Sequence, residues 1–311
     1  MTWGSKLRDL TPVERHGGMY FKRDDKFAPL GYGNINGSKL RQCIYLVDKW
    51  YDEGHLKGVA SGSVSQSPQH AFIAAACRHY NVGCYIVSGV RKPLEHKYLR
   101  MAHEFGAHIV SSRVGYAQAC GAQARKASLA WEGFRYLETN ITLDLEKNPA
   151  RDVEGFHRIG AWQVVNIPED VETLIIPCGS CNSVTSILYG IIMYPPPGLK
   201  RIVLMGIGNM GSNDIGYVRR RLRTVVGVQL GLDTDEYFDF NFASGNAKYD
   251  MIHLNLNGTG YCTYQQEMRE AIGDIRFHPR YEGKCIRYLK ERAPEYLTPT
   301  TCFWIVGSDV M

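Results

Sequence analysis

The sequence predicts an α/β protein with largely parallel sheets, and three observations support this fold class. Short apolar runs typical of buried strands alternate along the chain with amphipathic stretches typical of helices. The links between them are short and polar, and several helical patterns end at a glycine or a proline. A chain of 311 residues can form one large or two medium domains, since single cores stop growing near about 250 to 300 residues.

Composition and charge exclude several classes of protein. With 44% hydrophobic and 22% charged residues and a net charge of +5, the chain has a globular composition. It has no apolar stretch close to the roughly 20 residues that span a bilayer, so we expect no membrane partner. The N-terminal residues lack the apolar core of a signal peptide, which predicts a cytoplasmic protein. Reduced cysteines within apolar patterns predict packing roles for Cys43, Cys77, Cys84 and Cys302.

The first candidate site surrounds Lys39. A charged strand-like stretch at residues 20–25 precedes a loop rich in glycine and asparagine at residues 31–37. Lys39 follows, and then a helical pattern has Leu40, Cys43, Ile44 and Val47 on one face. A lysine at such a junction is partly desolvated and lies near helix amides, which lowers its pKa and suits it to Schiff-base chemistry. A solvated surface lysine is the alternative.

Two β-α units follow and predict a small α/β domain over residues 45–155, inserted into a larger domain of residues 1–44 and 156–311. The helix of the second unit stops at Gly106, a residue that commonly ends helices. The expected elements are strands at residues 58–61, 83–87 and 108–110 and helices at residues 70–80 and 94–105.

The second series begins with a strand at residues 173–177 and a helix at residues 184–193, which ends at the prolines of residues 195–197. Between them, the loop of residues 178–183 provides backbone N–H groups at a helix N-terminus, where an anion such as phosphate can bind. An ordinary turn with Ser183 as N-cap is equally consistent with this pattern. Cys178 and Cys181 also have the spacing of a redox or zinc half-site, but no second cysteine pair completes it.

Two further motifs have competing explanations. The glycines at 206, 208 and 211 follow a strand at residues 201–205 and match the outline of a dinucleotide fingerprint. The segment after them has few apolar positions, which argues against a helix packed on a sheet. The basic run at residues 219–223 could bind phosphates of nucleic acid, although a solvated helix face is the commoner explanation.

Together these segments resemble the fold-type-II pyridoxal-phosphate (PLP) enzymes, the tryptophan-synthase-β-like superfamily. They are most similar to its branch of 1-aminocyclopropane-1-carboxylate (ACC) deaminases and D-cysteine desulfhydrases. Residues 36–41 resemble the segment with the Schiff-base lysine, residues 65–70 the substrate loop and residues 179–183 the phosphate loop. Residues 258–261 and 278–284 resemble the branch's two tyrosine motifs, and the second, with Arg-Tyr-Glu-Gly-Lys, is the most specific match.

The resemblance implies two three-layer α/β domains with mainly parallel twisted sheets and an active site in the cleft between them. Residues 1–44 and 156–311 then form the large PLP-binding domain. PLP is the implied cofactor, and the family usually forms homodimers. Lys39 matches the Schiff-base residue and Glu282 the acid that faces the pyridine nitrogen. The phosphate-binding residues implied are Gly179, Ser180, Cys181, Asn182 and Ser183, the substrate-binding residues are Ser67, Gln69, Tyr261 and Tyr281, and the catalytic residues are Lys39, Ser67, Tyr261 and Tyr281, with no metal.

We therefore expect an enzyme that acts on an amino acid or a similar small-molecule amine through a lysine aldimine and a quinonoid intermediate. A deaminase or lyase is the first expectation. One departure favours a decarboxylase as the alternative: Pro68 replaces an asparagine of the family, so a backbone N–H that helps to hold the substrate carboxylate is absent. That substrate could be an amino acid attached to nucleic acid, as in phage base hypermodification. A non-catalytic binding protein on the same fold is the third hypothesis.

Overall fold

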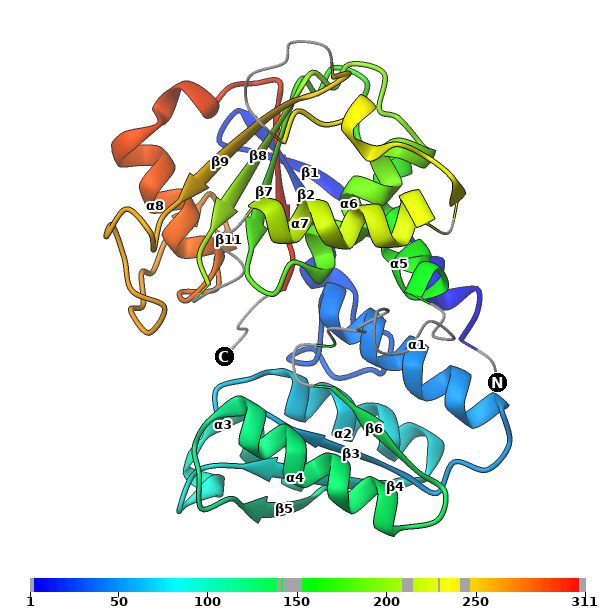
Figure 1. Ribbon diagram of the computed structural model, residues 1–311. Coiled ribbons are helices and arrows are strands. Elements are labelled where there is room, and N and C mark those ends of the chain that lie inside the picture. The colour runs from blue at the N-terminus through cyan, green and yellow to red at the C-terminus, as the bar shows by residue number, and fades with distance from the viewer. Residues whose placement is uncertain are drawn as a thin grey trace. The chain divides into compact units, whose positions relative to one another are not determined.

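The computed structural model describes residues 3–138, 141, 153–208, 215–228, 230–240 and 247–307. The chain divides into two compact units, which Figure 1 draws. Unit 1 comprises Met1–Leu7 and Ala28–Arg151, and unit 2 comprises Arg8–Phe27 and Asp152–Met311. Both are α/β with mainly parallel sheets, which confirms the predicted fold class. Residues 28–44, expected in the large domain, group with unit 1 because their helix packs on a helix of that unit.

Unit 2 contains a six-stranded sheet of order β1-β2-β12-β7-β8-β9, in which β1 alone among the described strands is antiparallel to its neighbour. A two-stranded ribbon of β10 and β11 accompanies the sheet. The strand bounds are β1 Val13–His16, β2 Met19–Arg23, β7 Thr173–Cys178, β8 Arg201–Gly206, β9 Asp250–Asn255, β10 Ala271–Ile272, β11 Ile275–Arg276 and β12 Thr301–Ile305.

Both faces of this sheet are covered, which explains why its central strands are apolar throughout. All six residues of β7 and all five of β12 are buried. Helix α8, Glu282–Arg292, packs on one face through Cys285, Ile286 and Leu289. Helix α6, Asn182–Met193, packs beside β7 with α5, Val153–Ala161, against it, and α7, Ile215–Leu222, contacts α6 (Figure 1). A π-helical segment, Arg223–Val228, continues α7.

Unit 1 contains a parallel four-stranded sheet of order β5-β4-β3-β6. Alternate side chains of β3 face opposite helices: Ala60 packs with Cys120 of α4, whereas Ser61 accepts a hydrogen bond from Gln69 of α2. Helices therefore cover both faces. The bounds are β3 Gly58–Gly62, β4 Gly83–Ser88, β5 His108–Ser111, β6 Phe134–Leu137, α1 Ser38–Asp52, α2 Gln69–Tyr80, α3 Lys97–Glu104 and α4 Ala117–Ala130.

The elements lie close to their predicted positions, with one clear difference. The helix expected at residues 94–105 is divided into a 3-10 turn, Pro93–Glu95, and α3. His96 separates them because its backbone is extended, at φ −93° and ψ 127°. The stop at Gly106 is confirmed, and its φ of 91° explains the glycine. Cys43, Cys77, Cys84 and Cys302 are buried free thiols, as expected of packing residues. Within the described residues, no helix combines the length and the apolar character needed to cross a membrane.

The contact between α5 and α6 can be tested at Gly190. A methyl group there would meet the carbonyl oxygen of Ala161 at 2.3 Å, and this backbone atom can move only if α5 shifts. We expect Gly190→Ala to lower the free energy of unfolding by about 1–3 kcal/mol, measured by urea denaturation. Gly4→Ala is the matched control, because nothing lies within 4 Å of the added methyl group. Equal stabilities of the two variants would contradict the tight packing.

Candidate functional site

The candidate site of unit 2 lies at the carboxyl ends of three parallel strands. Strands β2, β12 and β7 run in the same direction and are hydrogen-bonded side by side. Their carboxyl ends therefore lie at one edge of the sheet, where open α/β sheets bind their ligands. At this edge β2 leads into the 3-10 turn Asp24–Lys26, β12 leads to Val306, and β7 leads into the loop before α6.

The loop after β7 presents main-chain donors at a helix N-terminus. Cys181 is the N-cap of α6, has a φ of 65°, and makes no capping hydrogen bond with its side chain. The first bond of the helix runs from the Thr185 N–H to the Cys181 carbonyl at 2.9 Å, so the amides of Ser183 and Val184 precede it. No atom lies within 4 Å of a methyl group built on Gly179. Backbone amides, the helix dipole and open space together suit a phosphate.

The alternative interpretations of this loop have less support. Ser183 lies inside the helix and does not cap it, because the N-cap is Cys181. The sulfur atoms of Cys178 and Cys181 lie 3.4 Å apart, and their hydrogen bond, together with burial, raises the pKa of the Cys178 thiol. Throughout the described part of the chain, no group of three or more His, Cys, Asp or Glu side chains could hold a metal ion.

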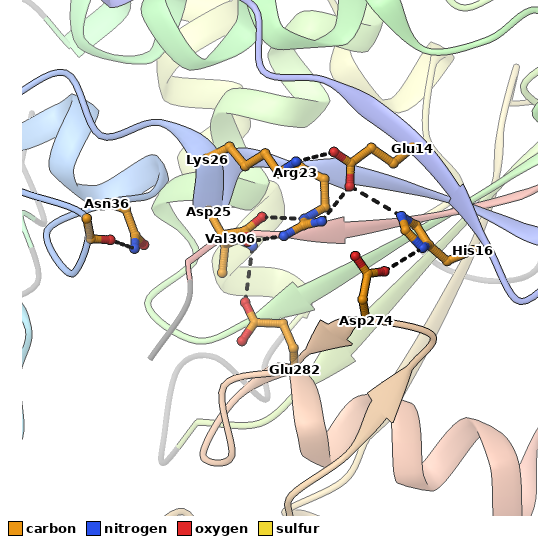
Figure 2. A network of polar contacts seen from close by, with 10 residues as sticks. Glu14, His16, Arg23, Asp25, Lys26, Asn36, Asp274, Glu282 and Val306 are labelled. Carbon is orange, nitrogen blue, oxygen red and sulfur yellow. Dashed lines mark hydrogen bonds and ion pairs between the residues drawn. The ribbon is translucent and has the colours of Figure 1, made fainter. Parts of the chain in front are cut away.

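Glu282 is a buried acid at the same edge. It begins α8, and its side chain is fully buried. Oε1 accepts the N–H of Val306 at 3.1 Å, whereas Oε2 is buried with no hydrogen-bond partner among the described residues (Figure 2). Burial raises the pKa of the Glu282 carboxyl from its ordinary 4.5 to about 8. A buried carboxyl with one unsatisfied oxygen can pair with a nitrogen of a ligand.

A charged network lies beside Glu282. The carboxylate of Asp25 adds to the rise in the pKa of Glu282, and Arg23 binds Asp25 through Nε at 2.9 Å and through a terminal nitrogen at 2.8 Å. Arg23 also binds Glu14 at 2.5 Å, and Lys26 pairs with the same carboxylate (Figure 2). The bidentate pair holds Asp25 in one geometry. The Asp25 charge near Glu282 is therefore part of a rigid arrangement.

Unit 1 holds the candidate amine. Lys39 is the second residue of α1, which begins at Ser38. The N-cap of this helix is Gly37, and its φ of 96° requires a glycine. The Asn36 side chain donates to the Gly33 carbonyl at 2.9 Å and shapes the preceding loop (Figure 2). Burial lowers the pKa of the Lys39 amine. The lower pKa raises the fraction of neutral, nucleophilic amine, as predicted from the loop-to-helix setting.

The Ser67 loop of the same unit has few backbone donors for an anion. The Ser67 N–H donates to the Val64 carbonyl at 3.0 Å, and Pro68 has no N–H. The His70 ring lies 3.0 Å from the same carbonyl through Nε2, and burial lowers the pKa of His70 to about 4, so the ring is neutral. The Gln69 amide nitrogen donates to Ser61 and to the Glu138 carbonyl, and its Oε1 is buried with no hydrogen-bond partner among the described residues.

The two predicted tyrosines lie in different surroundings. Tyr281 directly precedes Glu282 in the sequence, and its hydroxyl lies 3.2 Å from the hydroxyl of Tyr264. The Tyr261 hydroxyl instead donates to Glu291 at 2.8 Å, nine residues, or about 14 Å, further along α8 than Glu282. Tyr264 was missed in the sequence because the glycine motif ends at Tyr261, and residue spacing does not reveal which hydroxyl meets Tyr281.

The two remaining motifs contribute little to this site. Residues 209–214, including the last glycine of the dinucleotide-like pattern, lie outside the described residues. In the basic run, Arg219 and Arg223 both pair with Asp235, and Arg221 donates to the Tyr217 hydroxyl at 3.1 Å. Such intramolecular pairs favour the helix-face interpretation of the run.

Solved structures share this fold. An ACC deaminase homologue superposes with a TM-score of 0.69 at 12% identity, over 98% of this chain and 90% of that chain. The processed form of threonine deaminase isoform 2 from Solanum lycopersicum superposes with a TM-score of 0.59 at 17% identity, over 98% and 86%. No family model matches the chain.

One curated relative is much closer in sequence. The O-seryl-dTMP PLP-dependent decarboxylase of Salmonella phage ViI is 34% identical over 356 aligned positions, which cover 98% of this chain and 83% of the relative. The chain belongs to the fold-type-II PLP enzymes. Its cofactor is PLP, and the residues described above fit that group. This fold-type-II enzyme has an unsatisfied buried acid that could face the ring nitrogen and a loop of amides that could hold the phosphate.

The protonation of Glu282 predicts a pH dependence of stability in the cofactor-free enzyme. Because the folded pKa is raised, the folded state holds a proton that the unfolded chain loses above about pH 4.5. Stability should therefore fall as the pH rises from about 4.5 to 8, by as much as about 5 kcal/mol, and level off above that. Glu282→Gln should remove this part of the slope. Urea denaturation of both proteins at several pH values measures it, and parallel curves would contradict a buried neutral carboxyl.

Proposed function

We propose that this enzyme is a PLP-dependent decarboxylase whose substrate is a serine-like amino acid joined to a thymidine nucleotide. The main support is the Ser67 loop, in which the one backbone position expected to help hold a carboxylate, residue 68, has no N–H to offer. The Ser67 N–H is used by Val64, and Pro68 has none. The phage relative, named for O-seryl-dTMP decarboxylation, supports the same choice over a deaminase or lyase.

Carboxylate binding decides which bond can break. When bound, PLP would supply an electron sink for one bond at the substrate's α-carbon. A loop with a free amide at residue 68 would hold the substrate carboxylate in place and protect its bond to that carbon. A loop without that amide would leave the carboxylate free to turn, so that its bond to the α-carbon could break and release CO₂. Pro68 therefore favours decarboxylation because it has no backbone N–H.

Each proposed site residue then has a task. Lys39 would hold the cofactor aldehyde through its amine and, once the substrate has displaced it, deliver a proton to the α-carbon, with the Ser67 hydroxyl beside it. The amides of residues 179–183 would bind the phosphate, and Glu282 would hold a proton at the ring nitrogen. Tyr281 would orient the substrate, and Gln69 could contact it through Oε1. Tyr261 would need a different hydroxyl direction to take part, because Glu291 holds it.

The assignment of Lys39 and of the reaction can be tested together. We expect the purified enzyme to absorb near roughly 410 to 430 nm and Lys39→Ala to lose this band. With O-seryl-dTMP, the wild type should release CO₂ and an amine that keeps its nitrogen, whereas Lys39→Ala should lose about 10²-fold or more of this rate. Release of ammonia and a keto acid would instead establish the deaminase. No band after PLP is added would favour the non-catalytic binding protein.

The role of Pro68 has its own test. Pro68→Asn and Pro68→Ala both restore a backbone N–H, and only the first adds an amide side chain. If the missing N–H favours decarboxylation, both variants should release less CO₂, by about 10-fold for one regained hydrogen bond to a charged group. The ratio of CO₂ to ammonia measures this. An unchanged ratio in both variants would show that the proline does not decide the reaction.

A further inference from the structure

Lys284 is a buried cation that none of the proposed roles explains. It is the third residue of α8, and its side chain is fully buried. A positive charge near a helix N-terminus is unfavourable with respect to the helix dipole, and burial further opposes it. A buried ammonium in this place therefore needs strong local partners.

Those partners are main-chain carbonyls of one short turn. The Lys284 ammonium donates to the carbonyl of Thr263 at 2.7 Å and to that of Tyr264 at 2.9 Å. It also lies 5.7 Å from the centre of the Tyr264 ring, within cation-π range. These contacts fix both the backbone and the ring of Tyr264. The turn is thus attached to the first turn of α8.

Tyr264 in turn contacts Tyr281. Their hydroxyl groups lie 3.2 Å apart and their ring centres 6.4 Å apart. The His278 ring also packs against Tyr281, with its centre 4.6 Å from the centre of the Tyr281 ring. In a pair of hydroxyls, one donates its hydrogen and the other keeps its own hydrogen available for a third group. The pair therefore sets the direction in which Tyr281 can donate or accept.

Gly283 completes the assembly. A methyl group built on it would lie 2.0 Å from the Met268 carbonyl, so only glycine allows this backbone to approach α8. The Met268 N–H donates to the Pro279 carbonyl at 2.8 Å, which closes the segment between Tyr264 and His278. The four consecutive residues 281–284 thus provide a hydroxyl, a buried acid, a close backbone approach and a cation.

We infer that Tyr264 is a positioning residue for Tyr281 and that Lys284 holds Tyr264 in place. Lys284 fixes the turn at residues 263–264, the turn fixes the Tyr264 hydroxyl, and this hydroxyl aims that of Tyr281 beside Glu282. Because Tyr281 is assigned to the substrate only by the proposed function, the catalytic part of the inference rests on that proposal. The pairing itself does not depend on the reaction.

Stability measurements on the cofactor-free enzyme test the pairing. Tyr264→Phe, Tyr281→Phe and the double variant form a cycle in urea denaturation. If the hydroxyls interact, the second substitution should cost less in the presence of the first. Tyr261→Phe is the matched control, since it removes a hydroxyl from the same segment, but one that donates to Glu291 and not to Tyr281. Its effect on the free energy of unfolding should add to that of Tyr281→Phe. Additive effects of Tyr264→Phe and Tyr281→Phe would overturn the pairing.

Kinetics of the holoenzyme with O-seryl-dTMP test the positioning role. Tyr264→Phe and Lys284→Met should lower kcat on the order of 10- to 100-fold while KM changes less than about threefold, because the substrate still binds but a misaimed group slows its conversion. Lys284→Arg, which keeps the cation, should recover part of kcat. An unchanged kcat in Tyr264→Phe, or no recovery with arginine, would overturn the inference.

The two proposals fail in different ways. If the wild type releases no CO₂ from O-seryl-dTMP, the proposed function fails, and the stability cycle still decides whether the hydroxyls pair. If the wild type is active and Tyr264→Phe is equally active, the proposed function stands and the positioning role is wrong.

Discussion

The buried carboxyl of Glu282 is the constraint on which the unit 2 site depends. A carboxyl group removed from water keeps its proton unless its partners compensate for the loss of hydration, and here backbone N–H groups, that of Val306 among them, compensate only part of it. The remaining oxygen is oriented and unsatisfied among the described residues. An acid in this state suits a ring nitrogen that must stay protonated, which is why the fold supports the PLP assignment chemically as well as by likeness.

Sheet topology explains how distant segments come to surround that acid. Val306 follows β12, the loop of residues 178–183 follows β7, and the Asp24–Lys26 turn follows β2, although these segments are far apart in the sequence. Parallel pairing of the three strands brings their carboxyl ends to one edge. Helix α8 then packs across the apolar face and carries Glu282, Lys284 and their neighbours to the same edge. The site is thus a consequence of strand order.

In unit 1, the proposed chemistry depends on the loss of hydration at Lys39 and on the missing backbone N–H of Pro68. Burial takes water from Lys39 and leaves its amine more often neutral. The proline at position 68 leaves the loop that we propose binds the substrate without one backbone hydrogen-bond donor. The first feature reduces the hydration of an amine, and the second removes one hydrogen-bond donor. In the proposed mechanism they direct the same electron-withdrawing cofactor toward loss of CO₂.

Local patterns in the sequence were sufficient to predict the α/β class, the helix after Lys39, the stop at Gly106 and the loop after β7, because periodicity, glycine and proline act within a few residues. The resemblance of the Arg-Tyr-Glu-Gly-Lys motif to a known family singled out Glu282, whose role remains a prediction. Tertiary structure alone decided that Tyr264, and not Tyr261, meets Tyr281, that Lys284 binds two carbonyls some twenty residues away in sequence, and that residues 28–44 pack with unit 1. These outcomes depend on side-chain direction and on packing between segments far apart in the chain, which residue spacing does not encode.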